Sequence, residues 1–150
     1  TMKKTSLVLS TLLLFASNAW ALEKEVSSSF ENTWSKVLLS MSAEGTKISF
    51  IDKTSGFLQA STTVPKGKGF LYYHECKYPG ALISSTSNIS VVVQEISKDQ
   101  SKITINSKWV IESYLQSRLL FIKLSKTNYH TNCVSNGRLE EKLLSSFSKF

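Results

Sequence analysis

The 150-residue chain is poor in the residue types from which active sites are commonly built. It has only two histidines and two cysteines, and it contains no Gly-x-Ser-x-Gly nucleophile motif, no phosphate-binding glycine loop and no His-Glu-x-x-His zinc motif. The chain therefore lacks the motifs by which hydrolases, nucleotide-binding proteins and zinc proteases are commonly recognised. We therefore expect a protein that binds without catalysing a reaction, with no cofactor and no metal.

The chain also lacks clustered charge. Its net charge is +7, but the lysines are spread along the sequence, and the densest point is only Lys66-Gly67-Lys68. Proteins that read nucleic acids gather basic residues on one face of a recognisable module. We expect no nucleic-acid partner, while weak attraction to anionic lipid headgroups or cell-wall polymers is left open.

No apolar run is long enough to span a membrane. The longest, Leu7–Phe15, is shorter than the roughly 20 apolar residues that a spanning helix needs. It follows Lys3 and Lys4 and precedes Ala19-Trp20-Ala21, which together form the pattern of a bacterial secretory signal. We expect residues 1–21 to be a signal peptide, residues 22–150 to be a single domain, and the destination to be the periplasm or the exterior.

The two cysteines, Cys76 and Cys133, would both remain after cleavage. A pair of cysteines in an exported protein most often forms a disulfide. The alternative is a metal site that adds His74 and His130, but the His-x-Cys and His-x-x-Cys spacings are not those of structural zinc. The sequence therefore favours the disulfide.

Two helices are expected, one near each end of the domain. The first runs from about Phe30 to Glu44, begins at a Ser28-x-x-Glu31 capping box and ends at Gly45. The second runs from Gly137 to about Ser146, with Ser135 as its cap. The apolar faces at helical spacing are Phe30, Trp34, Val37, Leu38 and Met41 in the first helix, and Leu139, Leu143 and Phe147 in the second.

Between the helices, period-2 patterns predict antiparallel strands. They cover residues 47–52, 57–64 and 70–73, with a hairpin from about 89 to 111, and a short strand at 24–27 precedes the first helix. Residues 115–124 are apolar and fit either a helix or a strand. In the hairpin, the residues expected to be buried are Ile103, Ile105, Ser107, Trp109 and Ile111, and those expected to be solvated are Lys102, Thr104, Asn106, Lys108 and Glu112.

An amphipathic sheet needs a cover on its apolar face, which two amphipathic helices can supply. The predicted fold class is therefore α+β, a two-layer sandwich whose antiparallel sheet is covered on one face by an N-terminal and a C-terminal helix.

The pattern Phe30-x-x-x-Trp34-x-x-Val37-Leu38, followed by Gly45, Ile48, Asp52 and Gly56, resembles the helix-grip domains of the BamC type, found in an outer-membrane assembly lipoprotein. Gly137-x-Leu139-Glu140 before Leu143 resembles the last helix of such domains. The resemblance implies a helix-grip-like fold and an adaptor of an envelope complex without catalysis. The chain has no lipid-bearing cysteine at the expected cleavage site and has room for one such domain only.

The leading hypothesis is a non-catalytic periplasmic protein-interaction module, a subunit of an outer-membrane assembly or secretion complex. Its partners would be other envelope proteins, and peripheral contact with the outer membrane is left open. The residues that we assign to partner binding are Lys66, Lys68, Phe70, Tyr72 and Tyr73 around a basic aromatic loop, and Lys102, Thr104 and Lys108 on the open face of the sheet.

Two other hypotheses stay open. One is a free secreted inhibitor or immunity-type protein that inserts the loop Val64–Phe70 into another enzyme. The other is a small secreted hydrolase in which His74 and His130 act as acid and base.

Overall fold

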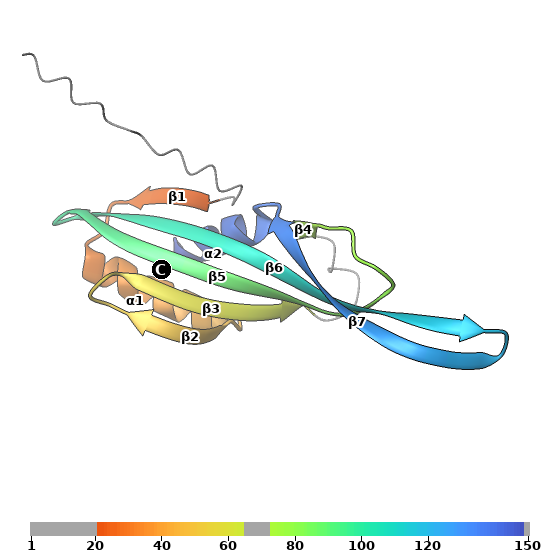
Figure 1. Cartoon of the computed structure of the whole chain (residues 1–150). Coiled ribbons are helices and arrows are strands. Elements are labelled where there is room, and N and C mark those ends of the chain that lie inside the picture. Colours follow the sequence, from red (N-terminus) through yellow and green to blue (C-terminus); the bar gives the residue numbers. More distant parts are fainter. Residues whose placement is uncertain (1–20, 65–72, 149–150) are drawn as a thin grey trace, which may run out of the picture.

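The computed structural model describes residues 21–64 and 73–148 (Figure 1). Its centre is a seven-stranded antiparallel sheet in the order β2-β3-β5-β6-β7-β4, and β1 pairs with the first part of β6. Along the chain the elements are β1 (Ala21–Val26), α1 (Phe30–Ala43), β2 (Lys47–Asp52), β3 (Phe57–Val64), β4 (His74–Glu75), β5 (Ala81–Ser97), β6 (Gln100–Leu119), β7 (Ile122–Ser135) and α2 (Arg138–Phe147).

The predicted two-layer α+β sandwich, a helix-grip-like sheet covered by helices, is wrong. Strands account for 61% of the structure and helices for 20%. The reason is the length of the central strands. At about 3.3 Å per residue, the 20 residues of β6 extend over about 66 Å, whereas the 14 residues of α1 make a helix of about 21 Å. The helices lie against one part of the sheet, and the rest continues beyond them (Figure 1).

The core lies where the helices meet the sheet. Trp34 of α1 is 3% exposed, as its helical spacing predicted. The alternation predicted for residues 102–112 is also confirmed, because Ile103, Ile105, Ser107, Trp109 and Ile111 are buried while their neighbours face outward. We call the face that carries these five residues the inner face of the sheet. The remaining large core side chains are Val37, Met41, Leu58, Ile89, Val91, Val93, Leu139, Leu143, Leu144 and Phe147.

The start of α1 differs from the expected capping box. The N-cap is Ser29, whose side chain accepts a hydrogen bond from Asn32 N at 3.3 Å. The carbonyl of Ser28 instead accepts from Ser101 Oγ at 2.8 Å, and Glu31 forms an ion pair with Lys53 at 2.6 Å. The other end agrees with the prediction, since Gly45 takes a left-handed φ of 73° just after the helix.

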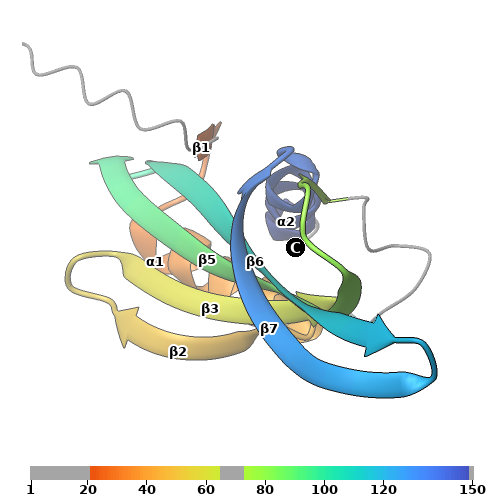
Figure 2. The ribbon, with the colours of Figure 1, turned by 45° about the vertical axis from the view of Figure 1, so that its right-hand side comes forward.

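Beyond the body of the sheet, β6 and β7 continue as a two-stranded ribbon. The pairing of β5 with β6 ends at Ala81↔Tyr114, whereas β6 stays paired with β7 as far as Leu119↔Ile122. We call residues 115–127 the arm. Figures 1 and 2 show it projecting away from both helices. The stretch 115–124, which the sequence left undecided between helix and strand, is therefore strand, turn and strand.

Residues 1–20 lie outside the described part of the chain, so the signal peptide stays a prediction. Ala21 is the first residue of β1, and Leu22 pairs with Ile105 and packs against the core. Cleavage after Ala21 would leave Leu22 in this position.

Candidate functional site

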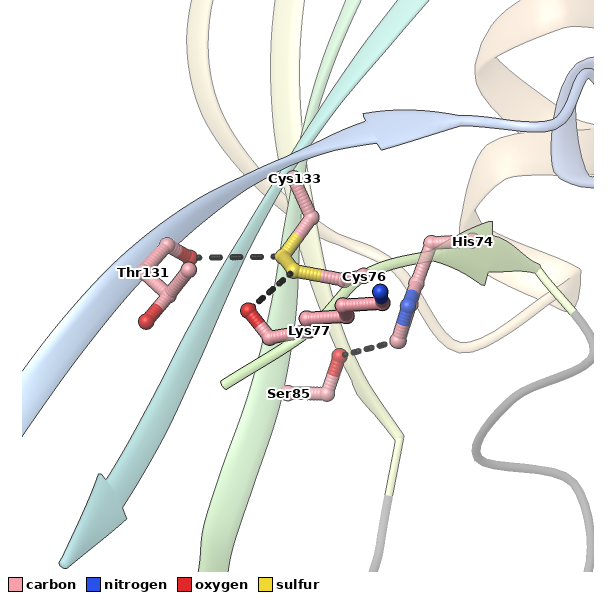
Figure 3. The surroundings of a disulfide bond; sticks show 6 residues. All are labelled: His74, Cys76, Lys77, Ser85, Thr131 and Cys133. Atoms are coloured by element: carbon pink, nitrogen blue, oxygen red, sulfur yellow. Dashed lines mark hydrogen bonds between the residues drawn. A yellow bond between two sulfur atoms is a disulfide. The ribbon is translucent and has the colours of Figure 1, made fainter. Parts of the chain in front are cut away.

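The predicted disulfide is present between Cys76 and Cys133, which are 57 residues apart in sequence (Figure 3). Their Cα atoms lie 5.4 Å apart, within the usual range for such a bond. Cys133 lies on β7 and pairs across the sheet with Trp109 of β6, so the bond ties the segment after β4 to the body of the sheet, six residues along each strand from the start of the arm at Leu115 and Thr127.

His74 lies in the interior beside this disulfide. Its ring centroid is 5.2 Å from that of Trp109, and its Nε2 atom is 3.3 Å from Ser85 Oγ (Figure 3). Burial lowers the pKa of His74 below its usual value of 6.5, because the charged imidazolium would lose its hydration. Burial therefore favours the neutral imidazole, and the residue is 1% exposed.

His130 lies on the opposite face of the sheet. It is exposed on β7, and its Nε2 atom is 3.9 Å from Glu112 Oε1. Because side chains alternate along a strand, His130 and Cys133, three positions apart, point to opposite faces. The disulfide therefore does not bring His74 and His130 together, and the described residues hold no group of three or more histidine, cysteine, aspartate or glutamate side chains that could bind a metal.

A second buried polar group joins α2 to the sheet. The carboxylate of Glu140 is fully buried and accepts hydrogen bonds from Ser107 N (3.2 Å), Ser107 Oγ (2.6 Å) and Ser135 Oγ (2.8 Å). Ser135 Oγ also accepts from Gly137 N at 3.2 Å. These bonds fix the first turn of α2 over β6 and β7. Because protein atoms enclose these hydrogen bonds, we assign Glu140 a structural role and not a binding role.

Of the residues predicted to bind a partner, the four that the structure describes do not form one surface. Tyr73 stacks on Trp109 with ring centroids 5.9 Å apart and lines a cleft with Thr63 and Lys142. Lys102 and Thr104 face outward from β6, and Lys102 lies 3.7 Å from Glu23. Lys108 is exposed further along the same strand. The remaining four predicted residues, Lys66, Lys68, Phe70 and Tyr72, lie outside the described part of the chain.

Among the described residues, the most exposed apolar surface is the tip of the arm, residues 119–122, for which the sequence predicted no site. Leu119 and Ile122 are 62% and 64% exposed, Leu120 is 88% exposed, and Phe121 is fully exposed. Leu120 and Phe121 form the turn between β6 and β7. Four consecutive large apolar side chains therefore stand in solvent at the far end of a projecting ribbon.

The turn at the tip has an unfavourable backbone conformation for its sequence. Leu120 has a φ of 52°, and among the described residues it alone has a positive φ without being glycine. Two-residue hairpin turns strongly prefer glycine, asparagine or aspartate at such positions. A bulky residue in the left-handed region is strained, and strain of this kind gathers at functional sites. The left-handed conformation of Leu120 therefore lowers the local stability of the tip.

The arm is also cationic. Arg118 pairs with Lys123 immediately behind the tip, and Lys126 Nζ lies 4.1 Å from the ring centroid of Tyr114. No aspartate or glutamate occurs between Glu112 and Glu140 in the sequence. The arm thus combines an apolar end with positive flanks and has no acidic residue to offset them.

Comparisons with known proteins do not identify a family for this chain. No family model matches the chain, and no curated protein does. Among solved structures, the chain is similar to a DUF4468 family protein from Bacteroides ovatus, with 10% sequence identity and a TM-score of 0.37 over 62% of this chain and 56% of that chain. Within residues 21–64 and 73–148, neither helix is long and apolar enough to cross a bilayer.

Proposed function

We propose that this protein is a non-catalytic binding module of the bacterial cell envelope that docks through its arm. The observation that carries the proposal is the exposed tip, where Leu119, Leu120, Phe121 and Ile122 are at least 62% exposed. Exposed apolar clusters of this kind mark interaction sites. The disulfide fits an oxidising compartment such as the periplasm.

The shape of the molecule supports docking by the arm. The body is held by a continuous apolar core and by the disulfide at Cys133, and the arm continues from strands β6 and β7 of that body, starting at Leu115 and Thr127. A two-stranded ribbon is only marginally stable by itself in water. The continuity of this ribbon with β6 and β7, which are paired within the body of the sheet, holds the tip away from the body. In a narrower form of the proposal, the module is a subunit of an outer-membrane assembly or secretion complex.

The competing hypotheses have less support. A hydrolase using His74 and His130 would need both side chains at one site, but they lie on opposite faces of the sheet, and His74 is 1% exposed. The loop Val64–Phe70 of the inhibitor hypothesis lies almost entirely outside the described residues. Nothing in the described part of the chain favours either alternative over docking by the arm.

Fractionation of cells that export the protein tests the proposal. The decisive variant is Leu120→Gly/Phe121→Asn, which replaces the strained apolar turn by a sequence suited to two-residue hairpin turns. We expect the wild type in the envelope fraction and the variant in the soluble periplasmic fraction. Leu39→Asn is the matched control, because it removes a leucine of α1 that is 61% exposed but far from the arm. Equal fractionation of the wild type and the tip variant would contradict docking by the arm.

A further inference from the structure

We infer that the tip of the arm inserts into the interfacial region of an anionic lipid bilayer. This inference rests on the proposed docking function and names the surface that the arm binds. Three independent features of the tip carry it: the arrangement of its apolar side chains, the placement of its positive charges and the strain in its turn.

The apolar side chains are exposed both on one face of the ribbon and at its turn. Leu119 and Ile122 form a cross-strand pair on one face, and Leu120 and Phe121 project from the turn itself. A protein pocket would have to enclose both that face and the turn. The headgroup and acyl boundary of a bilayer surrounds a shallowly inserted tip without any shape requirement, and it accepts apolar groups to a depth of about 5–10 Å.

The positive charges lie where lipid headgroups would meet them. Arg118 and Lys123 pair directly behind the apolar tip, and Lys126 follows on the same strand as Lys123. Long basic side chains near a membrane surface extend their charged ends toward the headgroups while their stems stay in the apolar region. With no acidic residue in the arm, the surface that complements it carries negative charge.

The backbone of the tip is compatible with shallow insertion. Leu119 and Ile122 pair across the hairpin, so the strand ends satisfy part of their hydrogen bonding within the ribbon. The free edges of the ribbon would stay among hydrated headgroups, because irregular backbone and open strand edges are excluded only from the hydrocarbon region itself. The positive φ of Leu120 then has an explanation, since glycine there would relieve the strain but would remove apolar surface from the inserted end.

Sedimentation with vesicles tests the inference on the purified, disulfide-bonded mature chain. The probes are vesicles of phosphatidylcholine alone and of phosphatidylcholine mixed with phosphatidylglycerol. We expect binding to the mixed vesicles, weaker binding to the neutral ones, and a decrease as salt concentration rises. Leu120→Gly/Phe121→Asn should weaken binding at least about tenfold, because two large apolar side chains are lost from the inserted end.

Two further variants separate the contributions. Arg118→Gln/Lys123→Gln should reduce binding to the anionic vesicles and remove most of the difference between the two lipid mixtures. Leu39→Asn should bind as the wild type does. Circular dichroism of each variant should match that of the wild type, which shows that the fold is retained.

The outcomes distinguish this inference from the proposed function. If the tip variant binds anionic vesicles as tightly as the wild type, or if the wild type does not bind them, the tip is not a membrane-insertion element. Should envelope fractionation in cells nevertheless depend on the tip, the arm docks on a protein, and the proposed function stands without this inference. If fractionation does not depend on the tip either, both are wrong.

Discussion

His74 and Ser85 meet in the interior of the protein, with Nε2 of the histidine 3.3 Å from Oγ of the serine. His74 belongs to the short strand β4, two residues before Cys76, whereas Ser85 lies on the long strand β5. Both side chains are almost completely buried. The contact lies beside the disulfide in the body of the protein, and the burial of His74 there lowers the pKa of its imidazole.

The first prediction concerns the pH dependence of stability. Burial lowers the pKa of His74 below 6.5 in the folded protein, so around that pH the unfolded state binds more protons than the folded state. The stabilisation is fully present above about pH 6.5 and decreases as the pH falls toward the lowered value. We expect the free energy of unfolding, measured with denaturant, to decrease over this range.

Two variants identify the responsible group. His74→Gln should be less dependent on pH in this interval, whereas His130→Gln, at the exposed histidine on the other face, should keep the wild-type dependence. If His130→Gln abolishes the dependence and His74→Gln leaves it, the assignment of the buried histidine is wrong.

The second prediction concerns the disulfide. Removing it by Cys76→Ser/Cys133→Ser should lower the free energy of unfolding by about 4 kcal/mol, since a crosslink between residues 57 apart restricts a long loop of the unfolded chain. Denaturant unfolding of the variant should match that of the wild type in reducing agent. A variant as stable as the oxidised wild type would show that the crosslink is not a main source of stability.

The third prediction concerns Trp34, which is 3% exposed and stacks on Phe30 with ring centroids 6.0 Å apart. Truncation of such a side chain typically costs about 3–5 kcal/mol. We expect Trp34→Ala to be destabilised by that amount in thermal and denaturant unfolding. The control Lys102→Ala/Lys108→Ala, on the outer face, should change stability by no more than about 0.5 kcal/mol. If Trp34→Ala is as stable as the wild type and the lysine variant unfolds, the buried and exposed faces of the sheet have been assigned the wrong way round.

The fourth prediction concerns Glu140. Replacement by alanine leaves the buried Ser107 N–H without its acceptor and should lower the free energy of unfolding by about 1–3 kcal/mol. Glu141→Ala is the matched control, because Glu141 is the next residue along α2 and is exposed. Equal effects of the two substitutions would show that the buried hydrogen bonds do not stabilise α2 on the sheet.

Some of this structure could be predicted because its signals are local. The helical spacing of Trp34, Val37 and Met41 predicted which face of α1 is buried, and the alternation of Ile103, Ile105 and Trp109 predicted the inner face of β6. The pairing of Cys76 with Cys133 followed from their number and the expected export. Each of these inferences needs only the residues of one element or a count.

The extent of the sheet could not be predicted in the same way. The first half of β5 is rich in serine and threonine, and Ser85 and Ser87 occupy fully buried positions on the inner face. A pattern that depends on apolar residues does not detect a strand whose buried positions are serines. The strand was therefore expected to begin near residue 89, although β5 begins at Ala81.

The arm was missed for two reasons. Each strand of the arm alternates near the tip, with Leu119, Ile122 and Leu124 on one face and Arg118 and Lys123 on the other, but the four consecutive apolar residues 119–122 interrupt the period of 2. Its turn, Leu120-Phe121, contains none of the glycine, asparagine, aspartate or proline residues that mark turns. A combined signal was present, however, because Arg118 and Lys123 flank an apolar run on a stretch without acidic residues.

The position of the tip relative to a bilayer is the most direct test of the account. In Phe121→Trp, the indole should show a blue-shifted emission with anionic vesicles and should be quenched by lipids brominated on their acyl chains, after subtraction of the wild-type spectrum. Leu39→Trp, on the exposed face of α1, should bind the same vesicles without a shift or quenching. If the Phe121→Trp protein binds the vesicles but its added tryptophan remains unshifted and unquenched, the tip does not enter the membrane and the account is contradicted.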